Sequence, residues 1–199
     1  MNKIQQFFIH RHDIYCNQKY ADGLPYSFHL KMVNAQAIKF KKYIPVDEPY
    51  YTAVQIGIWG HDAIEDARMT YNDIVNLNDI LQLQHINNLT LLQAEQACGL
   101  GANIIYACTE NRGRNRTERH DEIFFRTLVH NRDAVFAKLC DVIANVKFSL
   151  LENSSMFEKY KKEWVVFKEW LINSNVEREN YLVEFPDMID HLEQLFVIK

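Results

Sequence analysis

Proline and glycine are scarce in this sequence, which has four prolines and six glycines among 199 residues. This composition leaves little room for disordered linkers, because such segments are rich in residues that do not continue helices or strands. Cysteine is also infrequent, and no two cysteines form a CxxC pair. The four cysteines, Cys16, Cys98, Cys108 and Cys140, are therefore expected to be reduced thiols in a cytoplasmic protein.

The chain also lacks a large excess of charge and a long hydrophobic run. Its formal net charge is −4, which argues against a general affinity for nucleic acid. No run approaches the roughly 18 apolar residues that a membrane-spanning helix needs, and residues 1–16 contain no segment typical of a signal peptide. With 48% hydrophobic and 24% charged residues, the composition is that of an ordinary globular protein, and we predict a single domain over residues 1–199.

Apolar residues recur mainly at helical spacing, and extended alternation of the kind seen in strands is absent. The fold class predicted is therefore all-α, with roughly eight to ten helices. The helical segments expected are 1–20, 27–44, 50–67, 69–78, 90–110, 122–151 (one or two helices), 155–172 and 186–198. A turn with Gly23 and Pro25, a break at residues 45–49 and a polar loop at residues 111–121 separate some of them.

Several local features refine these expectations. Ser27 is expected to cap the helix over 27–44, and Thr70, with Asp73 three residues later, to cap a short helix. Ala53, Gly57 and Gly60 form a stripe of small residues that lets another backbone approach closely. The glycines of the Gly-Leu-Gly sequence at 99–101 are expected to break the helix over 90–110.

One short stretch of the sequence contains several residues that could bind a metal ion or act as bases. The apolar run that ends at Gly60 is followed within six positions by His61, Asp62, Glu65 and Asp66. On one helix these side chains would share a face, since residues three and four apart are neighbours. Because clustered carboxylates repel one another, a divalent cation among them is the simplest explanation. A buried hydrogen-bonded pair at His61–Asp62 and a solvated helix end at Glu65–Asp66 are the alternatives.

Two further residues are candidate ligands for such a cation. His29 is a polar residue in an otherwise apolar helical stripe, and Asp141 lies inside the apolar sequence VFAKLCDVIANV. An aspartate there is costly to bury without a partner. Coordination of a cation together with His61 and Asp62 would stabilise it.

The order His, then His-Asp, then Asp resembles the HD-domain metal-dependent phosphohydrolases. Within that superfamily, residues 10–150 are most similar to the alarmone hydrolases, which include the hydrolase half of the RelA/SpoT family and small stand-alone enzymes. The similarity rests on a Gly-x-Pro-Tyr turn, a His-Asp-x-x-Glu-Asp block and a Lys-Leu-x-Asp-x-x-x-Asn block. The matching residues are Gly23, Pro25, Tyr26; His61, Asp62, Glu65, Asp66; and Lys138, Leu139, Asp141, Asn145.

The resemblance implies an HD-domain helical bundle with a core over about 10–150, on which the helices of about 155–198 pack. The resemblance implies that His29, His61, Asp62 and Asp141 bind one metal ion. By analogy with the family this ion is Mn²⁺, and Fe, Co or Zn are the other options. Glu65 and Asp66 would then orient or deprotonate the attacking water. Asn145 would contact the sugar or phosphate of a phosphorylated nucleotide, and a helix-capping or core-bonded amide is the alternative for it. Lys138 would lie either near the phosphate or on the protein surface.

The chain also departs from the alarmone hydrolases. Val142 occupies the position after Asp141 where they usually have a basic residue, and Tyr20 stands where an arginine often stacks on the base. Tyr20 would either stack on the base or pack in the core. Arg112, Arg114 and Arg116 are candidate phosphate contacts, because several arginines suit a multiply phosphorylated ligand. An ordinary solvated turn is the alternative for this segment.

These observations leave three functions open. The first is hydrolysis of the 3′-pyrophosphate of guanosine tetra- or pentaphosphate or of an adenosine analogue. The second is hydrolysis of a nucleoside mono- or triphosphate, and the third is a non-catalytic module that binds a nucleotide. No nucleic acid or membrane partner is expected. The C-terminal helices would cover the domain or form the contact of a homodimer.

Overall fold

The computed structural model describes residues 2–85, 88–110, 116–173 and 181–198. It is almost entirely helical, which confirms the all-α fold class predicted from sequence. Among the described residues, eight α-helices have seven residues or more and five are shorter. The α-helices are α1 (Lys3–Ile9), α2 (Ser27–Lys39), α3 (Tyr50–Gly60), α4 (Ala63–Asp66), α5 (Tyr71–Val75), α6 (Leu77–Leu81), α7 (Leu91–Cys108), α8 (Arg116–Arg119), α9 (Glu122–Val129), α10 (Arg132–Leu151), α11 (Met156–Asn173), α12 (Tyr181–Glu184) and α13 (Pro186–Val197).

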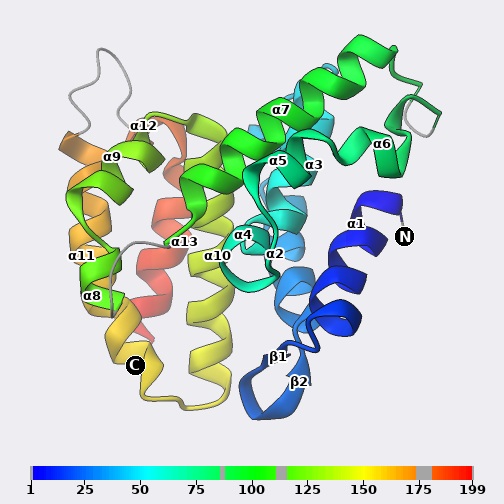
Figure 1. The fold of residues 1–199 in the computed structure, drawn as a ribbon. Helices are drawn as coiled ribbons and strands as arrows, with labels where there is room; N and C mark the ends of the chain where they lie inside the picture. Colours follow the sequence, from blue (N-terminus) through cyan, green and yellow to red (C-terminus); the bar gives the residue numbers. More distant parts are fainter. Residues whose placement is uncertain (1, 86–87, 111–115, 174–180, 199) are drawn as a thin grey trace.

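Helix α10 occupies the middle of the molecule. Figure 1 shows it between α2, α3 and α7 on one side and the C-terminal helices α11 and α13 on the other, and it contacts all of these helices. Its buried residues include Phe136, Leu139 and Ile143, which are fully shielded from solvent. A helix buried on nearly all sides holds any polar residue it carries in a fixed position, so Asp141 is firmly placed.

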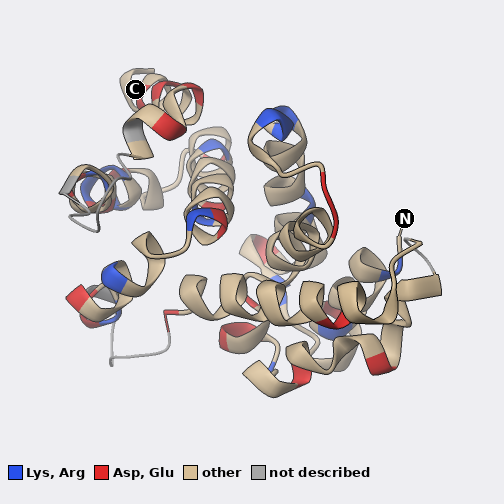
Figure 2. Cartoon of the chain, turned by 90° about the horizontal axis from the view of Figure 1, so that it is seen from above, with Lys and Arg blue, Asp and Glu red and all other residues tan. Residues whose placement is uncertain are grey.

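Helices α3 and α7 pack closely against each other. Gly57 of α3 faces Ile104, and Gly60 faces Ile105 and Phe8, so the stripe of small residues does admit a neighbouring helix. Helix α7 has a single charged residue, Glu95, whereas α10 and α11 carry charged residues of both signs. Figure 2 marks Lys and Arg in blue and Asp and Glu in red along the helices. No described helix combines the length and the hydropathy required to cross a bilayer.

The sequence prediction of a break in α7 at Gly99–Gly101 was wrong, because the helix runs without interruption from Leu91 to Cys108. A Cβ atom added at Gly101 would lie 2.6 Å from Ile56 Cγ2 and 3.3 Å from the carbonyl oxygen of Ala53. Gly101 is therefore required for close packing on α3 and does not end the helix.

Replacing Gly101 by alanine should accordingly lower the free energy of unfolding by about 1–3 kcal/mol, the usual cost of overpacking. Gly99 provides a matched control in the same helix, because a Cβ atom there meets no other atom within 4 Å. Gly99→Ala should raise stability by roughly 0.5–1 kcal/mol through the better helix propensity of alanine. Urea unfolding measures both changes, and equal effects of the two substitutions would contradict this account of the α3–α7 contact.

The N-terminal region also differs from the prediction of one helix over residues 1–20. Helix α1 passes into a π-helix, η1 (His10–Tyr15), and the chain then forms a two-stranded antiparallel hairpin of β1 (Lys19–Tyr20) and β2 (Leu24–Pro25). The hairpin turn is the 3₁₀ segment η2 (Ala21–Gly23), and Gly23 there has a φ of +84°, which favours glycine. The predicted turn at Gly23 and Pro25 is therefore present, with short strands on either side.

Capping was predicted correctly in one place and wrongly in another. Thr70 caps α5 through a reciprocal pair of hydrogen bonds with Asp73, as the sequence indicated. Ser27, in contrast, is the first residue of α2, and the side chain of Asp13 accepts its backbone N–H at 2.9 Å. Asp13 comes from the π-helix η1, a partner that local sequence rules do not reveal.

The prediction of one or two helices over residues 122–151 was correct, whereas the predicted loop over 111–121 was only partly right. Residues 122–151 form two helices, α9 and α10, with Asn131 capping the second. The expected loop over 111–121 contains the short helix α8, and its first five residues lie outside the described part of the chain.

Candidate metal centre

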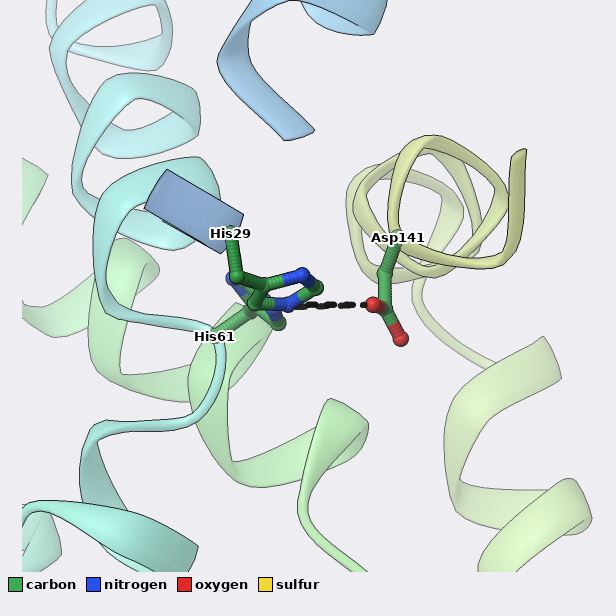
Figure 3. A group of neighbouring side chains, drawn as sticks. All are labelled: His29, His61 and Asp141. Carbon is green, nitrogen blue, oxygen red and sulfur yellow. Dashed lines mark hydrogen bonds and ion pairs between the residues drawn. The ribbon is translucent and has the colours of Figure 1, made fainter. Parts of the chain in front are cut away.

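Three side chains from distant parts of the sequence converge inside the helical bundle. His29 comes from α2, His61 from the turn after α3, and Asp141 from α10, and all three are buried. One ligand atom from each lies within 4.8 Å of the other two, so the group could hold a metal ion. Figure 3 shows the two imidazole rings side by side with the Asp141 carboxylate facing them.

The distances between the ligand atoms fit a shared cation. The two histidine Nε2 atoms are 3.2 Å apart, and Asp141 Oδ1 is 3.3 Å from that of His29 and 3.9 Å from that of His61. With metal–ligand bonds of about 2.1 Å, neighbouring ligand atoms lie about 3.0 Å apart in an octahedral site and about 3.4 Å apart in a tetrahedral one. The distances of 3.2 and 3.3 Å are close to these values, whereas the 3.9 Å between His61 Nε2 and Asp141 Oδ1 is longer than both.

Asp62, the fourth predicted ligand, borders this group. Its Oδ2 is 2.9 Å from His61 Nε2 and 3.4 Å from His29 Nε2. Its side chain is more exposed than those of the three buried residues, at 16% against 9% or less. Asp62 therefore lies on the solvent side of the group.

The orientation of His61 also suits a metal ligand. Its Nδ1 lies 3.0 Å from the carbonyl oxygen of Ile58, to which the N–H at that position would donate. This bond leaves the lone pair of a neutral imidazole on Nε2, the atom that faces His29 and Asp141. The donor set of nitrogen and carboxylate oxygen atoms is one that Mn, Fe, Co and Zn all accept.

Electrostatic coupling within the group is strong. Burial lowers the pKa of His29, but bonds to Asp141 and Asp62 outweigh this effect and raise that pKa to about 9. Burial raises the pKa of Asp141, but Lys138 and the two histidines outweigh this effect and lower it below its usual value. The buried carboxylates thus require positive charge, which either a divalent cation or protonated histidines can provide.

The sequence predicted one continuous helix over residues 50–67, but the structure interrupts it around His61. Helix α3 ends at Gly60, and Asp62 has φ −101° and ψ 6°, which lies outside the helical region. Gly60 packs so tightly on Phe8 and Ile105 that a side chain there would clash with both. The turn at residues 61–62 therefore presents His61 and Asp62 separately from α4, which carries Glu65 and Asp66.

A chain of hydrogen bonds holds Asp141 in place. Asn145 Nδ2 donates to Asp141 Oδ1 at 2.6 Å, and the Tyr20 hydroxyl donates to Asn145 Oδ1 at 2.9 Å. Lys138 Nζ lies 3.3 Å from Asp141 Oδ2. Three residues that the sequence assigned to substrate contact, Tyr20, Asn145 and Lys138, therefore act in this structure on Asp141, directly or through Asn145.

Tyr20 has a second role in packing. Its ring stacks on His29 with a centroid distance of 5.0 Å and an interplanar angle of 19°, and it also contacts Phe148 at 5.0 Å. One face of the ring is thus covered by a candidate ligand. This arrangement corresponds to the packing alternative that the sequence left open for Tyr20.

The two predicted catalytic carboxylates lie next to the metal group. Glu65 Oε2 accepts the backbone N–H of Glu110 at 3.2 Å, and Glu65 Oε1 pairs with Arg119 Nη1 at 3.3 Å. Burial and the nearby charges of Glu110 and Asp62 raise the pKa of Glu65. Asp66 Oδ2 lies 3.0 Å from the hydroxyl of Tyr26.

Sequence reasoning missed the buried ion pair beside this site. Lys138 Nζ contacts Glu110 Oε1 at 2.6 Å, and His120 Nε2 lies 2.9 Å from Glu110 Oε2. Burial raises the pKa of Glu110, but Lys138 and His120 outweigh this effect and hold it far below its usual range. A signal was present in the sequence, since Glu110 comes two residues after the apolar end of α7 at Cys108, where a lone carboxylate needs a partner.

These residues line one open pocket of about 570 Å³, counting the solvent at its mouth. The lining residues are Tyr20, Tyr26, His29, Asp62, Glu65, Asp66, Glu110, Lys138, Asp141, Asn145 and Tyr160. Tyr160 comes from α11, so the C-terminal helices take part in the pocket.

The side chains of the predicted arginine contacts are not among those that the structure describes. Arg112 and Arg114 lie outside the described residues, and Arg116 is described only as the first residue of α8, without its side chain. Arg119, which sequence reasoning did not select from this segment, is the arginine seen to contact the site, through Glu65.

Comparisons with known proteins return no match: no family model, no curated protein and no solved structure resembles the chain closely enough to be reported. The geometry of the His29–His61–Asp141 group, which could bind a metal ion, is therefore the main structural indication of function.

Proposed function

We propose that this protein is a metal-dependent phosphohydrolase of the HD type that acts on a phosphorylated nucleotide. The observation that carries the proposal is the convergence of His29, His61 and Asp141 within 4.8 Å, from three separate elements. The order of these residues along the chain is also that of the HD ligands. An open pocket beside the group provides space for a small substrate.

The residues have distinct roles in this proposal. His29, His61, Asp62 and Asp141 hold one divalent cation, for which Mn²⁺ is the first candidate and Fe, Co and Zn are others. Such a cation, when bound, lowers the pKa of a water molecule and polarises a phosphoryl oxygen.

The other residues of the pocket act around this group. Glu65, whose raised pKa suits a base, accepts a proton, and Asp66 helps to orient water. Lys138, held between Glu110 and Asp141, provides positive charge beside the phosphate.

The substrate proposed is an alarmone, with cleavage of the 3′-pyrophosphate of guanosine tetra- or pentaphosphate or of an adenosine analogue. Support comes from the sequence blocks around Tyr26, Asp62 and Asp141, which resemble those of alarmone hydrolases.

A second candidate is hydrolysis of a nucleoside mono- or triphosphate. The packing of Tyr20 on His29 favours it, because the residue expected to stack on the base is engaged with a candidate ligand instead.

A substrate screen in the presence of Mn²⁺ tests the proposal. Guanosine tetraphosphate should be converted to GDP and pyrophosphate, whereas a chelator should stop the reaction. Release of orthophosphate from nucleoside monophosphates, or of triphosphate from nucleoside triphosphates, would favour the second candidate. Nucleotide binding without turnover of any compound would contradict both and indicate a non-catalytic binding module.

A further inference from the structure

The hydroxyl group of Tyr26 lies between two carboxylates of the pocket. Its oxygen is 2.5 Å from Asp62 Oδ2 and 3.0 Å from Asp66 Oδ2. A phenol has one hydrogen to donate, so it can serve only one of these carboxylates at a time. The shorter distance indicates that Asp62 is the acceptor.

A phenol, whose ordinary pKa is about 10, keeps its hydrogen at neutral pH and remains a donor.

The ring of Tyr26 is held by its neighbours. It stacks on the fully buried ring of His12, with a centroid distance of 4.6 Å and an interplanar angle of 8°. It also meets His29 at 5.4 Å and Tyr20 at 6.2 Å in edge-to-face contacts. His12 is itself positioned by the π-helix η1 and by Gln18, whose Oε1 lies 2.6 Å from its Nδ1. The hydroxyl cannot swing away from Asp62 unless several of these residues move.

The oxygen that Tyr26 contacts is the one that faces the histidines. Asp62 Oδ2 lies 2.9 Å from His61 Nε2 and 3.4 Å from His29 Nε2. An imidazole that binds a cation through Nε2 carries no hydrogen on that atom, so neither histidine can then donate to Asp62. Within the part of the chain that the structure describes, Tyr26 is then the donor that remains for Asp62 Oδ2.

We propose that Tyr26 is a positioning residue of the metal centre, whose hydroxyl orients Asp62 Oδ2 toward the Nε2 atoms of His29 and His61. The inference rests on the proposed metal-binding function and adds to it the residue that prepares the fourth ligand. Mutation of a residue that hydrogen-bonds to a metal ligand typically lowers metal affinity by about 10–100-fold. Asp66 is left without the phenolic hydrogen, which is consistent with a separate role toward water.

The test compares Mn²⁺ affinity, measured by titration calorimetry on the full chain, between the wild-type protein and Tyr26→Phe. The substitution keeps the ring and its stacking on His12 and removes only the hydroxyl. Affinity should fall by about 10–100-fold, and kcat at saturating Mn²⁺ should stay within about threefold of wild type. Tyr71→Phe is the matched control, because its hydroxyl donates to Asn103, an exposed residue of α7, and is not recorded in contact with a candidate ligand.

Each outcome bears on the proposal. A wild-type protein that binds no Mn²⁺ would overturn the metal centre and this role together. Normal wild-type binding with an unchanged affinity in Tyr26→Phe would overturn the role of Tyr26 alone, as would a loss of kcat without a loss of affinity. Should Tyr26→Phe not fold, His12→Leu carries the test, since it removes the stacking ring but leaves the hydroxyl. Its Mn²⁺ affinity should fall by at least threefold, and an unchanged value would overturn the proposal.

Discussion

Replacing Asp141 by asparagine should abolish measurable Mn²⁺ binding and, with it, hydrolysis. The substitution keeps the shape of the side chain but removes the negative charge that faces His29 at 3.3 Å and His61 at 3.9 Å. We expect affinity to fall by more than about 100-fold, because loss of a partner behind a ligand already costs about 10–100-fold. Titration calorimetry measures the affinity, and circular dichroism checks that the helical fold is retained.

Asp133 offers a control on the same helix. It also lies on α10, but its side chain pairs with Arg132 at 2.9 Å and does not line the pocket. Asp133→Asn should therefore leave Mn²⁺ affinity unchanged. If Asp141→Asn bound Mn²⁺ as tightly as wild type, the cluster would be a set of hydrogen-bonded ion pairs and the proposed metal centre would be wrong.

Replacing Glu65 by glutamine should slow hydrolysis by about 10²–10⁴-fold, the usual contribution of a general base, while Mn²⁺ affinity stays within about threefold. Glutamine can still accept the backbone N–H of Glu110, which now bonds to Glu65 Oε2, so the local structure should persist. It cannot take up a proton from water, which is the function proposed for Glu65. Steady-state kinetics at saturating Mn²⁺ provide the rate, and calorimetry provides the affinity.

Glu122→Gln is the corresponding control, because Glu122 lies on the exposed face of α9 in an ion pair with Arg126. Its rate should match wild type. Should Glu65→Gln also retain a wild-type rate, the assignment of Glu65 would have to be abandoned, and Asp66 would be the next residue to test in the same way.

Much of the fold could be predicted from the sequence because the relevant signals are local. The helical class follows from apolar spacing within single segments, and the Thr70 cap follows from two residues three positions apart. The stripe of Ala53, Gly57 and Gly60 likewise indicated a close helix contact before its partner, α7, was known. The break expected at Gly99–Gly101 failed for the opposite reason, since the purpose of Gly101 is set by Ile56 on another helix.

The candidate site likewise has a part that could be predicted from the sequence and a part that could not. His29, His61, Asp62 and Asp141 were identified from residue type, order and resemblance, and three of them form the buried group that could bind a metal. The supporting contacts were not predictable, because they join residues far apart in the sequence. Tyr20 reaches Asn145 across 125 positions, and Arg119 reaches Glu65 across 54.

The sequence by itself determined that this protein is helical and which residue types it could offer to a cation. Only the tertiary structure decided that the turn after α3 separates His61 and Asp62 from Glu65 and Asp66, and that Tyr26 and Glu110 support the site. The physical reason is the range of the interactions involved. Helix propensity and capping act over a few residues, whereas burial, ion pairing and the orientation of a ligand depend on which distant segments pack together.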